Sequence, residues 1–263
     1  MFVPDNTVMI CVDFADILAQ TLPRNRHHFS RAVVVTHPDD LATIVVCQRN
    51  SVECLLTEVF YERGAEFNKW AALEMGLDYL GRNGWTLIMD CDIVLPDRIP
   101  EVFAPQAGCL YTPRRRDLRA WQNGILPDHL WKRYRHVNAR EEFAGYFQLF
   151  HADDPVLKSR PWFGRDWRWA GTADALFQRR WPANKQIRPP FEVLHLGIPY
   201  ANWAGRVQPY GDGRIPERAE ERKQKYDTFL RQRTQIAGHD DRYQGEKIWT
   251  GLAEDACSVR RID

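Results

Sequence analysis

Short runs of apolar residues alternate with longer amphipathic stretches over the first hundred positions of the chain. The short runs contain β-branched residues and have the length of strands, so we predict strands at residues 8–12, 32–36, 51–56 and 84–90. Because these strands alternate with helical stretches, the chain is expected to form a mostly parallel sheet with helical crossovers.

The amphipathic stretches between the strands are predicted helices. The first starts near Asp16 and is expected to end at Pro23, because proline cannot continue the hydrogen-bond pattern of a helix. The second begins after Asp40, whose side chain can cap the helix. The third covers residues 67–80 and is expected to end at Gly81.

The second half of the chain has a less regular pattern. After residue 96 the segments become shorter and richer in Pro, Trp and Arg. Residues 145–150 and 191–197 are further predicted strands, and the charged stretch 217–235 is a predicted helix.

Asp90 and Asp92 directly follow the apolar run of the strand at 84–90. On an extended backbone, carboxylates two residues apart leave the same face, roughly 6.6–7 Å apart along the strand. Two such charges repel each other by roughly 2.4 kcal/mol at an effective dielectric constant near 20. A divalent cation with oxygen ligands compensates such repulsion. The alternative, a strand-end aspartate that caps a turn, explains one carboxylate of the pair.

Other aspartates also fall at predicted strand ends. Asp13 follows the first strand, and Asp39 and Asp40 follow the second. Ligands of parallel sheets bind beyond the carboxyl ends of the strands. One cleft can therefore gather these residues with Asp90 and Asp92.

Composition restricts the class of protein. The chain has 263 residues, 44% of them hydrophobic, which suits one large α/β domain or a domain with an appendage. No apolar run approaches the ~18–20 residues that cross a bilayer, and the N-terminus lacks the basic region of a signal peptide. The six cysteines form no C-x-x-C pair, which argues against a zinc site or a disulfide framework. We therefore expect a cytoplasmic protein.

The net charge of +1 gives no overall attraction to nucleic acid, but basic residues cluster between Arg114 and Arg140. Trp121, Trp131 and Tyr134 are interleaved with them, and planar rings can stack on sugars or bases. The alternative is that these tryptophans belong to the core and the arginines to a solvated face.

Two common nucleotide-binding motifs are missing. The turn after the first strand reads DFADILAQ and has no glycine, so neither a dinucleotide-binding G-x-G-x-x-G nor a P-loop is present there. A phosphatase with an aspartyl nucleophile requires D-x-D at this turn. Asp13 and Asp16 have the wrong spacing for it.

Several motifs in order resemble a nucleotide-sugar glycosyltransferase of the GT-A type. In that group a segment like F-N-K-x-x-A-L-x-x-G-L precedes a strand ending in D-x-D, and the matching residues here are Phe67, Asn68, Lys69, Ala72, Leu73, Gly76, Leu77, Asp90 and Asp92. Three later segments also resemble parts of that group. The strand that closes the acceptor side is similar to GYFQLFH, and the segment with the acidic acceptor-site residue is similar to WAGTADALFQRRW. The segment whose histidine completes the metal site is similar to HLGIPYANWAGR. The resemblance covers residues 6–206.

The resemblance implies an α/β GT-A fold: a Rossmann-like, mostly parallel central sheet with flanking helices and a mixed acceptor-side region. The expected domain is residues 1–210, with a nucleotide-binding half at 1–100 and an acceptor half at 101–210, followed by a charged, helical extension at 211–263. The implied activity is metal-dependent transfer of a sugar from a nucleoside diphosphate donor, a UDP-sugar first of all, to an acceptor hydroxyl.

The implied cofactor is Mn²⁺ or Mg²⁺, which would stabilise the leaving diphosphate as a Lewis acid. Asp92 would bind the ion directly, and Asp90 would hold the ribose or bind the metal through water. His195 would supply an imidazole ligand, which favours Mn²⁺ over Ca²⁺. The alternative is a structural histidine.

The resemblance also implies donor and acceptor residues. Asn68 and Lys69 would line the donor site, with Lys69 pairing with a carboxylate or phosphate unless it is a solvated helix residue. Asp174 is the first choice as general base and Asp166 the second. Related enzymes often have two acidic residues where Ala173 and Asp174 stand, so the inverting or retaining course stays open. Asp174 would otherwise be a helix N-terminal residue.

The donor base is expected at the end of the first strand. Asp13 would contact the base or ribose, and Asp40 or Arg49 would line the same pocket. The spacing does not separate the roles of Asp39 and Asp40, and the alternative is that both cap the following helix.

Two other classes of protein remain as alternatives. One is a metal-dependent nucleotidyltransferase or phosphate-ester hydrolase that uses the same carboxylates. The other is a nucleotide- or carbohydrate-binding module without catalysis, which fits Ala173. The sequence leaves the acceptor and the oligomeric state undetermined. A lipid acceptor would require docking to a membrane surface, and a nucleic-acid base could be presented through the basic aromatic region, Arg114–Arg140.

Overall fold

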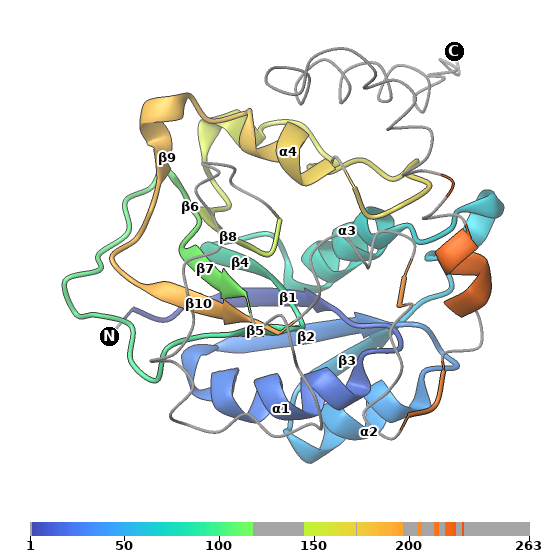
Figure 1. Ribbon diagram of the computed structural model, residues 1–263. Helices are drawn as coiled ribbons and strands as arrows, with labels where there is room; N and C mark the ends of the chain where they lie inside the picture. Colours follow the sequence, from blue (N-terminus) through green and yellow to red (C-terminus); the bar gives the residue numbers. More distant parts are fainter. Residues whose placement is uncertain are drawn as a thin grey trace, which may run out of the picture.

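The fold has three layers, with helices on both faces of a twisted central sheet (Figure 1). This computed structural model describes residues 2–117, 145–171, 173–196, 205–206, 213–215, 219–224 and 228. Most of the basic aromatic region and most of the C-terminal extension lie outside these ranges.

The central sheet has seven strands in the order β3-β2-β1-β4-β8-β6-β9. Its strands are β1 Asn6–Ile10, β2 Arg31–Thr36, β3 Glu53–Leu56, β4 Trp85–Asp90, β6 Leu110–Tyr111, β8 Phe147–His151 and β9 Gln186–Ile187. Strands β3, β2, β1 and β4 are parallel neighbours, whereas β8 runs antiparallel to β4 and β6. The predicted Rossmann-like, mostly parallel sheet with a mixed second half is confirmed.

A second, three-stranded sheet lies beside the end of β4. It has the order β5-β10-β7, with β5 Ile93–Val94, β7 Arg114–Asp117 and β10 Glu192–His195. Strand β10 is antiparallel to β5 and parallel to β7. This small sheet carries His195 back to the D-x-D segment.

The labelled α-helices of the described residues are divided between the faces of the central sheet. Helices α1 (Ala15–Asn25) and α2 (Leu41–Arg49) cover one face, and α3 (Lys69–Leu80) and α4 (Ala173–Gln178) cover the other (Figure 1). The described residues also contain the short 3-10 turns η1 Arg26–His28, η2 Glu62–Gly64, η4 Pro155–Leu157 and η5 Ala183–Lys185. Alternate residues of β1 enter opposite cores, with Met9 in one and Val8 in the other, as the twofold period of a strand requires.

Gly76 explains how closely α3 packs on the sheet. A Cβ atom at this position would lie 2.6 Å from Cγ1 of Val8 and 2.9 Å from Cγ2 of Val35, closer than packed atoms allow. The helix then ends at Gly81, which adopts a left-handed φ of 94°. These two glycines fix the height and the length of the helix that begins with Lys69.

The expected end of the first helix was wrong. Helix α1 continues past Pro23 to Asn25. Asn25 is held by the chain after the D-x-D segment, since its side chain donates to the carbonyl of Ile93 (2.7 Å) and accepts from the amide of Leu95 (2.9 Å). These tertiary contacts stabilise a last turn that proline alone would weaken.

Three further features of the described residues relate to the sequence predictions. Residues 219–224 are helical, and the rest of the predicted helix at 217–235 lies almost entirely outside the described residues. Within the described ranges, no helix is both long and apolar enough to cross a lipid bilayer. The cysteines there carry free thiols: Cys11, Cys47, Cys54, Cys91 and Cys109.

Candidate functional site

Two side chains of α1 hold the backbone on both sides of Asp92. The hydroxyl of Thr21 donates to the carbonyl of Cys91 (2.6 Å), and Asn25 donates to the carbonyl of Ile93 (2.7 Å). Thr21 and Asn25 are both buried. Sequence reasoning missed them, although polar residues on the buried face of an amphipathic helix were an available signal.

Asp92 and His195 form a buried pair beyond the end of β4. Oδ2 of Asp92 lies 3.2 Å from Nε2 of His195, and each side chain is less than a tenth exposed. Burial opposes ionisation of Asp92, but the neighbouring His195, with Lys69 and Arg115, outweighs burial and lowers the pKa of the carboxyl. Its Oδ1 is buried and accepts no hydrogen bond from the described residues. Asp92 is therefore an ionised carboxylate that keeps one acceptor oxygen unused among the described residues.

Asp90 is paired with Lys69, the first residue of α3. Nζ of Lys69 donates to Oδ1 of Asp90, and the lysine side chain is 13% exposed whereas that of Asp90 is 31% exposed. Burial alone would lower the pKa of Lys69, but Asp90, followed by Asp174 and Asp92, outweighs it and raises the pKa. Lys69 is therefore a fixed cation among three carboxylates rather than a solvated helix residue.

Asn68 positions Lys69 from the preceding position. Its Oδ1 accepts from the amide of Ala71 (3.1 Å) as the N-cap of α3, and its Nδ2 donates to the carbonyl of Arg165 (2.7 Å). Asn68 is buried and both ends of its side chain are engaged. The asparagine before Lys69 therefore ties the start of the helix to the loop that leads to α4.

Asp174 approaches the same carboxylates from α4. Its Oδ2 accepts from the amide of Gly145 (2.8 Å) and its Oδ1 from the amide of Ala175 (2.9 Å). A Cβ atom at Gly145 would lie 2.6 Å from Cβ of Asp174, so glycine permits this approach. Burial raises the pKa of Asp174, although Lys69 and the two amides partly oppose the increase.

We call Lys69, Asp90, Asp92, Asp174 and His195 the β4 cluster. Its members come from the end of β4, the start of α3, the start of α4 and the end of β10. The charges of Asp90, Asp92 and Asp174 all act on Lys69. The structure thus brings together half of the residues that the sequence singled out, and Asn68 adjoins them as the N-cap of α3.

Asp13 and Asp40 lie at the carboxyl ends of β1 and β2, where the sequence analysis predicts that the donor base binds. Asp40 caps α2 through the amide of Thr43 (3.1 Å), and its other oxygen accepts from the amide of Asp13 (2.9 Å) and the hydroxyl of Thr36 (3.2 Å). Through these bonds the side chain of Asp40 fixes the backbone at the ends of β1 and β2. This backbone includes Asp13, which has a left-handed φ of 64°. Asp40 is thus the helix cap that the sequence allowed.

Two arginines from the C-terminal part of the chain lie at the end of β1. Arg206 binds both carboxylate oxygens of Asp16 (2.5 and 2.9 Å) and the carbonyl of Asp13 (3.0 Å). Arg222 contacts Oδ2 of Asp13 (3.2 Å) and donates to the hydroxyl of Tyr61 (2.9 Å). Both arginines are buried. We call Asp13, Asp16, Arg206 and Arg222 the β1 cluster; the sequence analysis assigned no role to its two arginines.

Two expected site residues lie elsewhere. Arg49 is exposed in the last turn of α2, and this helix runs back from the carboxyl edge of the sheet, so Arg49 lies at the opposite edge from Asp13. Asp166 is 86% exposed and pairs with the exposed Arg63 at 3.4 Å. The prediction that Arg49 lines the donor pocket was therefore wrong. Asp166, unlike Asp174, is a solvent-exposed carboxylate.

The run Arg114–Arg116 does not form one basic face. Arg114 is exposed, Arg116 pairs with Glu192, and Arg115 lies over the ring of Tyr146 at 4.7 Å from its centroid. The rest of the predicted basic aromatic region, residues 118–140, lies outside the described residues.

The geometry of Asp92 and His195 fits a divalent cation. Two ligand atoms at right angles around an ion, each about 2.1 Å from it, lie about 3 Å apart, close to the 3.2 Å that separates Oδ2 and Nε2. Among the described residues, no group of three or more His, Cys, Asp or Glu side chains is arranged to hold an ion. Mg²⁺-type sites commonly use one or two carboxylates and take their other ligands from substrate phosphates and water.

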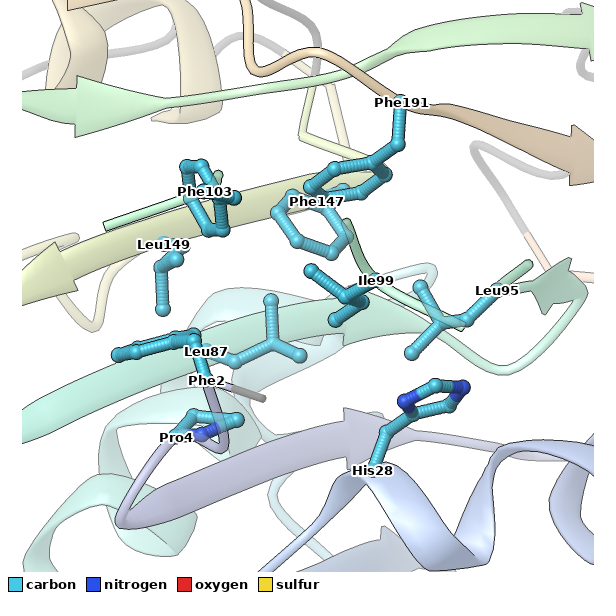
Figure 2. A pocket seen from close by; sticks show the side chains of 10 residues that line it. All are labelled: Phe2, Pro4, His28, Leu87, Leu95, Ile99, Phe103, Phe147, Leu149 and Phe191. Atoms are coloured by element: carbon cyan, nitrogen blue, oxygen red, sulfur yellow. The ribbon is translucent and has the colours of Figure 1, made fainter. Parts of the chain in front are cut away.

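A small apolar cavity lies apart from both clusters, between the central sheet and the segment after β5 (Figure 2). Its volume is about 10 Å³, and its walls include Leu95, Phe147, Phe191 and His28. His28 is fully buried, and neither ring nitrogen has a hydrogen-bond partner among the described residues. Burial, followed by repulsion from His27, lowers the pKa of His28 to about 4.

No protein-family model matches the sequence, and no curated protein sequence matches it. Among solved structures, one similar chain is a mutant Drosophila β-1,4-galactosyltransferase 7 in complex with manganese, UDP-Gal and xylobiose (13% identity, TM-score 0.39); the match covers 71% of this chain and 65% of that one. The chain therefore spans less than two thirds of that enzyme.

Two other similar structures are an inositol-1-phosphate CTP transferase from T. maritima and a mannosyl-3-phosphoglycerate synthase from Rubrobacter xylanophilus. The first is 9% identical (TM-score 0.45; 86% of this chain and 97% of that chain), and the second is 14% identical (TM-score 0.42; 94% and 80%). Because these sequence identities and TM-scores are low, any assignment of function must rest on the residues of this chain itself.

Proposed function

We propose that this protein is a metal-dependent GT-A glycosyltransferase that moves a sugar from a nucleoside diphosphate donor, a UDP-sugar first of all, to an acceptor hydroxyl. The observation that carries the proposal is the buried Asp92–His195 pair, whose Asp92 keeps one oxygen without a hydrogen bond among the described residues. Buried groups with perturbed pKa values at the carboxyl ends of parallel strands are typical of active sites.

In this proposal Asp92 and His195 hold Mn²⁺ or Mg²⁺, and Asp90 holds the donor ribose or acts on the metal through water. The bound ion would supply Lewis-acid stabilisation of the diphosphate that leaves the sugar. Lys69 keeps Asp90 in place and adds positive charge beside the phosphates. Thr21 and Asn25 keep the Asp92 backbone rigid, which limits the reorganisation needed at binding.

Asp174 is the proposed general base for an inverting transfer. It is a partly buried member of the β4 cluster, its pKa is raised, and a raised pKa favours proton uptake near neutral pH. Asp166, the second choice, is a solvated carboxylate paired with Arg63.

The donor base and ribose are proposed to lie at the end of β1 near Asp13. We propose residues 1–210 as the catalytic domain, with halves at 1–100 and 101–210. The extension 211–263 is not independent of it, since Arg222 contacts Asp13 and Tyr61. The proposed location is the cytoplasm, which the free thiols support.

A thermal-shift panel of nucleoside diphosphates and their sugars, each with Mn²⁺ or with EDTA, tests the donor site. A ligand that binds the native state raises the melting temperature. We expect one nucleotide series to stabilise the wild type with Mn²⁺, and this stabilisation to be lost in Asp92→Asn but kept in Asp153→Asn, whose carboxylate is 80% exposed.

Different outcomes separate the rival classes. Release of the nucleoside diphosphate from its sugar supports sugar transfer, whereas pyrophosphate release from a nucleoside triphosphate would identify a nucleotidyltransferase. Tight binding without turnover over a range of sugar acceptors would favour a binding module. No shift with any nucleotide would overturn the proposal. A salt-sensitive mobility shift with DNA or RNA would test a nucleic-acid acceptor.

A further inference from the structure

Arg115 is a cation beside the β4 cluster. The sequence analysis included it only as part of the basic aromatic region, Arg114–Arg140. Strand β7 pairs in parallel with β10 so that Arg115 lies opposite Val193 and Asp117 lies opposite His195. Paired residues of parallel strands project to the same face, and so do residues two apart. Arg115 and His195 therefore project from the same face of the small sheet.

The neighbours of Arg115 on the strand point the other way. Arg116 is turned to the opposite face, where its guanidinium pairs with Glu192, and Arg114 is exposed. The strand thus separates one arginine from a basic run and directs it toward the carboxylates. The electrostatics agree, since the charge of Arg115 contributes to the lowered pKa of Asp92.

Tyr146 holds the guanidinium of Arg115 beside the site. The guanidinium lies 4.7 Å from the centre of the tyrosine ring, and the ring is fixed because its hydroxyl donates to the carbonyl of Pro113 (2.5 Å). The carbonyl of Tyr146 accepts from the amide of Asp90 (3.0 Å), and the preceding residue, Gly145, binds Asp174. The platform under Arg115 is therefore tied to two members of the β4 cluster.

We propose that Arg115 binds the phosphate groups of the nucleotide donor, an inference that rests on the proposed function. A guanidinium can bind phosphate with two parallel hydrogen bonds, a geometry that the ammonium group of a lysine does not provide. A residue in this role acts on the diphosphate, not on the base. Its removal should therefore reduce the preference for diphosphates over monophosphates.

Isothermal titration of UDP and UMP, and of pyrophosphate and phosphate, tests this role, each with Mn²⁺ and with EDTA. If the thermal-shift panel selects another base, its diphosphate and monophosphate replace UDP and UMP. The variants are Arg115→Gln and Arg115→Lys, with the exposed Arg114→Gln on the same strand as the matched control. We expect Arg115→Gln to lower the ratio of diphosphate to monophosphate affinity by about 10- to 100-fold, Arg115→Lys to lower it less, and Arg114→Gln to leave it unchanged.

The outcomes separate this inference from the proposed function. If the wild type prefers the diphosphate and Arg115→Gln keeps that preference, Arg115 has a structural role on Tyr146 and the inference fails alone. An equal loss of diphosphate and monophosphate affinity would also overturn it, because that result indicates a general disturbance of the site. If no nucleotide binds the wild type, the proposed function fails first, and the inference fails with it.

Discussion

The β1 and β4 clusters lie at neighbouring strand ends of the same sheet but differ in how their charges are matched. In the β1 cluster each carboxylate meets an arginine: Asp16 binds Arg206 through both oxygens, and Asp13 contacts Arg222. In the β4 cluster Lys69 pairs with Asp90, while Asp92 has an oxygen without a hydrogen bond among the described residues, and Asp174 has a raised pKa.

This difference distinguishes a structural contact from a reactive one. A buried ion pair whose partners are matched contributes modestly to stability, and breaking it is costly because one charge is left buried. The β1 cluster fits that description and joins the C-terminal arginines to the first strand. Carboxylates with unmatched acceptors beside a fixed cation can instead bind a ligand that supplies the missing charge, and the β4 cluster is of this kind.

The largest expected effect is in the β4 cluster. Asp92→Asn keeps the shape of the side chain but removes the negative charge that would bind the cation. We expect release of nucleoside diphosphate from the donor to slow by about 10³-fold, because Lewis-acid stabilisation is worth several kcal/mol. Initial rates with saturating Mn²⁺ measure the effect. Wild-type rates in this variant would show that the pair of Asp92 and His195 is structural.

The β1 cluster should respond in the opposite way, with a loss of stability. Asp16→Asn leaves the guanidinium of Arg206, which is 1% exposed, without its anionic partner. We expect the free energy of unfolding to fall by about 3 kcal/mol, measured by urea denaturation with circular dichroism. Asp39→Asn, at an exposed carboxylate, is the control and should change it by less than about 0.5 kcal/mol. If Asp16→Asn also changed the free energy of unfolding by less than about 0.5 kcal/mol, the ion pair between Asp16 and Arg206 would not have the structural role described here.

The same contrast explains which residues could be predicted from the sequence. Lys69, Asp90 and Asp92 lie close together in the chain at the joints of a regular strand–helix alternation, so their meeting follows from the fold. His195 was found through its place in an ordered set of motifs. The β4 cluster could therefore be expected as a group before its geometry was known.

The β1 cluster could not be predicted in this way. Arg206 is separated from Asp16 by 190 residues, and no local pattern indicates which of many arginines returns to the first strand. Arg49 was misplaced because its helix reverses direction, which puts its last turn at the other edge of the sheet. Asp40 had two possible roles from spacing alone, and only the three hydrogen bonds to its side chain show the cap.

His28 tests whether acid sensitivity arises outside both clusters. Its pKa is about 4 in the folded protein and about 6.5 when unfolded, so below pH 6.5 the unfolded chain binds a proton that the folded chain refuses. Stability is therefore lost as pH falls from 6.5 toward 4. We expect His28 to account for about 2 kcal/mol of the loss between pH 7 and pH 5.

Urea denaturation of wild type and His28→Leu at both pH values measures this contribution. Leucine suits the apolar cavity and cannot be protonated (Figure 2). We expect the variant to lose about 2 kcal/mol less than the wild type, and the exposed His27→Gln to keep most of the wild-type loss. Equal losses in His28→Leu and wild type would assign the acid sensitivity to the carboxylate clusters instead.

The smallest expected effect is a shift in the pH dependence of turnover set by Asp174. A general base must be deprotonated, so kcat/KM should fall tenfold per pH unit below the pKa of Asp174, which burial raises from its ordinary value. Lys69 opposes that increase, so Lys69→Met should move the acid limb to still higher pH. Asp166→Asn, at an exposed carboxylate, should leave the limb in place. If Asp166→Asn moves the limb and Lys69→Met does not, the base is Asp166, and the raised pKa of Asp174 reflects burial in a structural position.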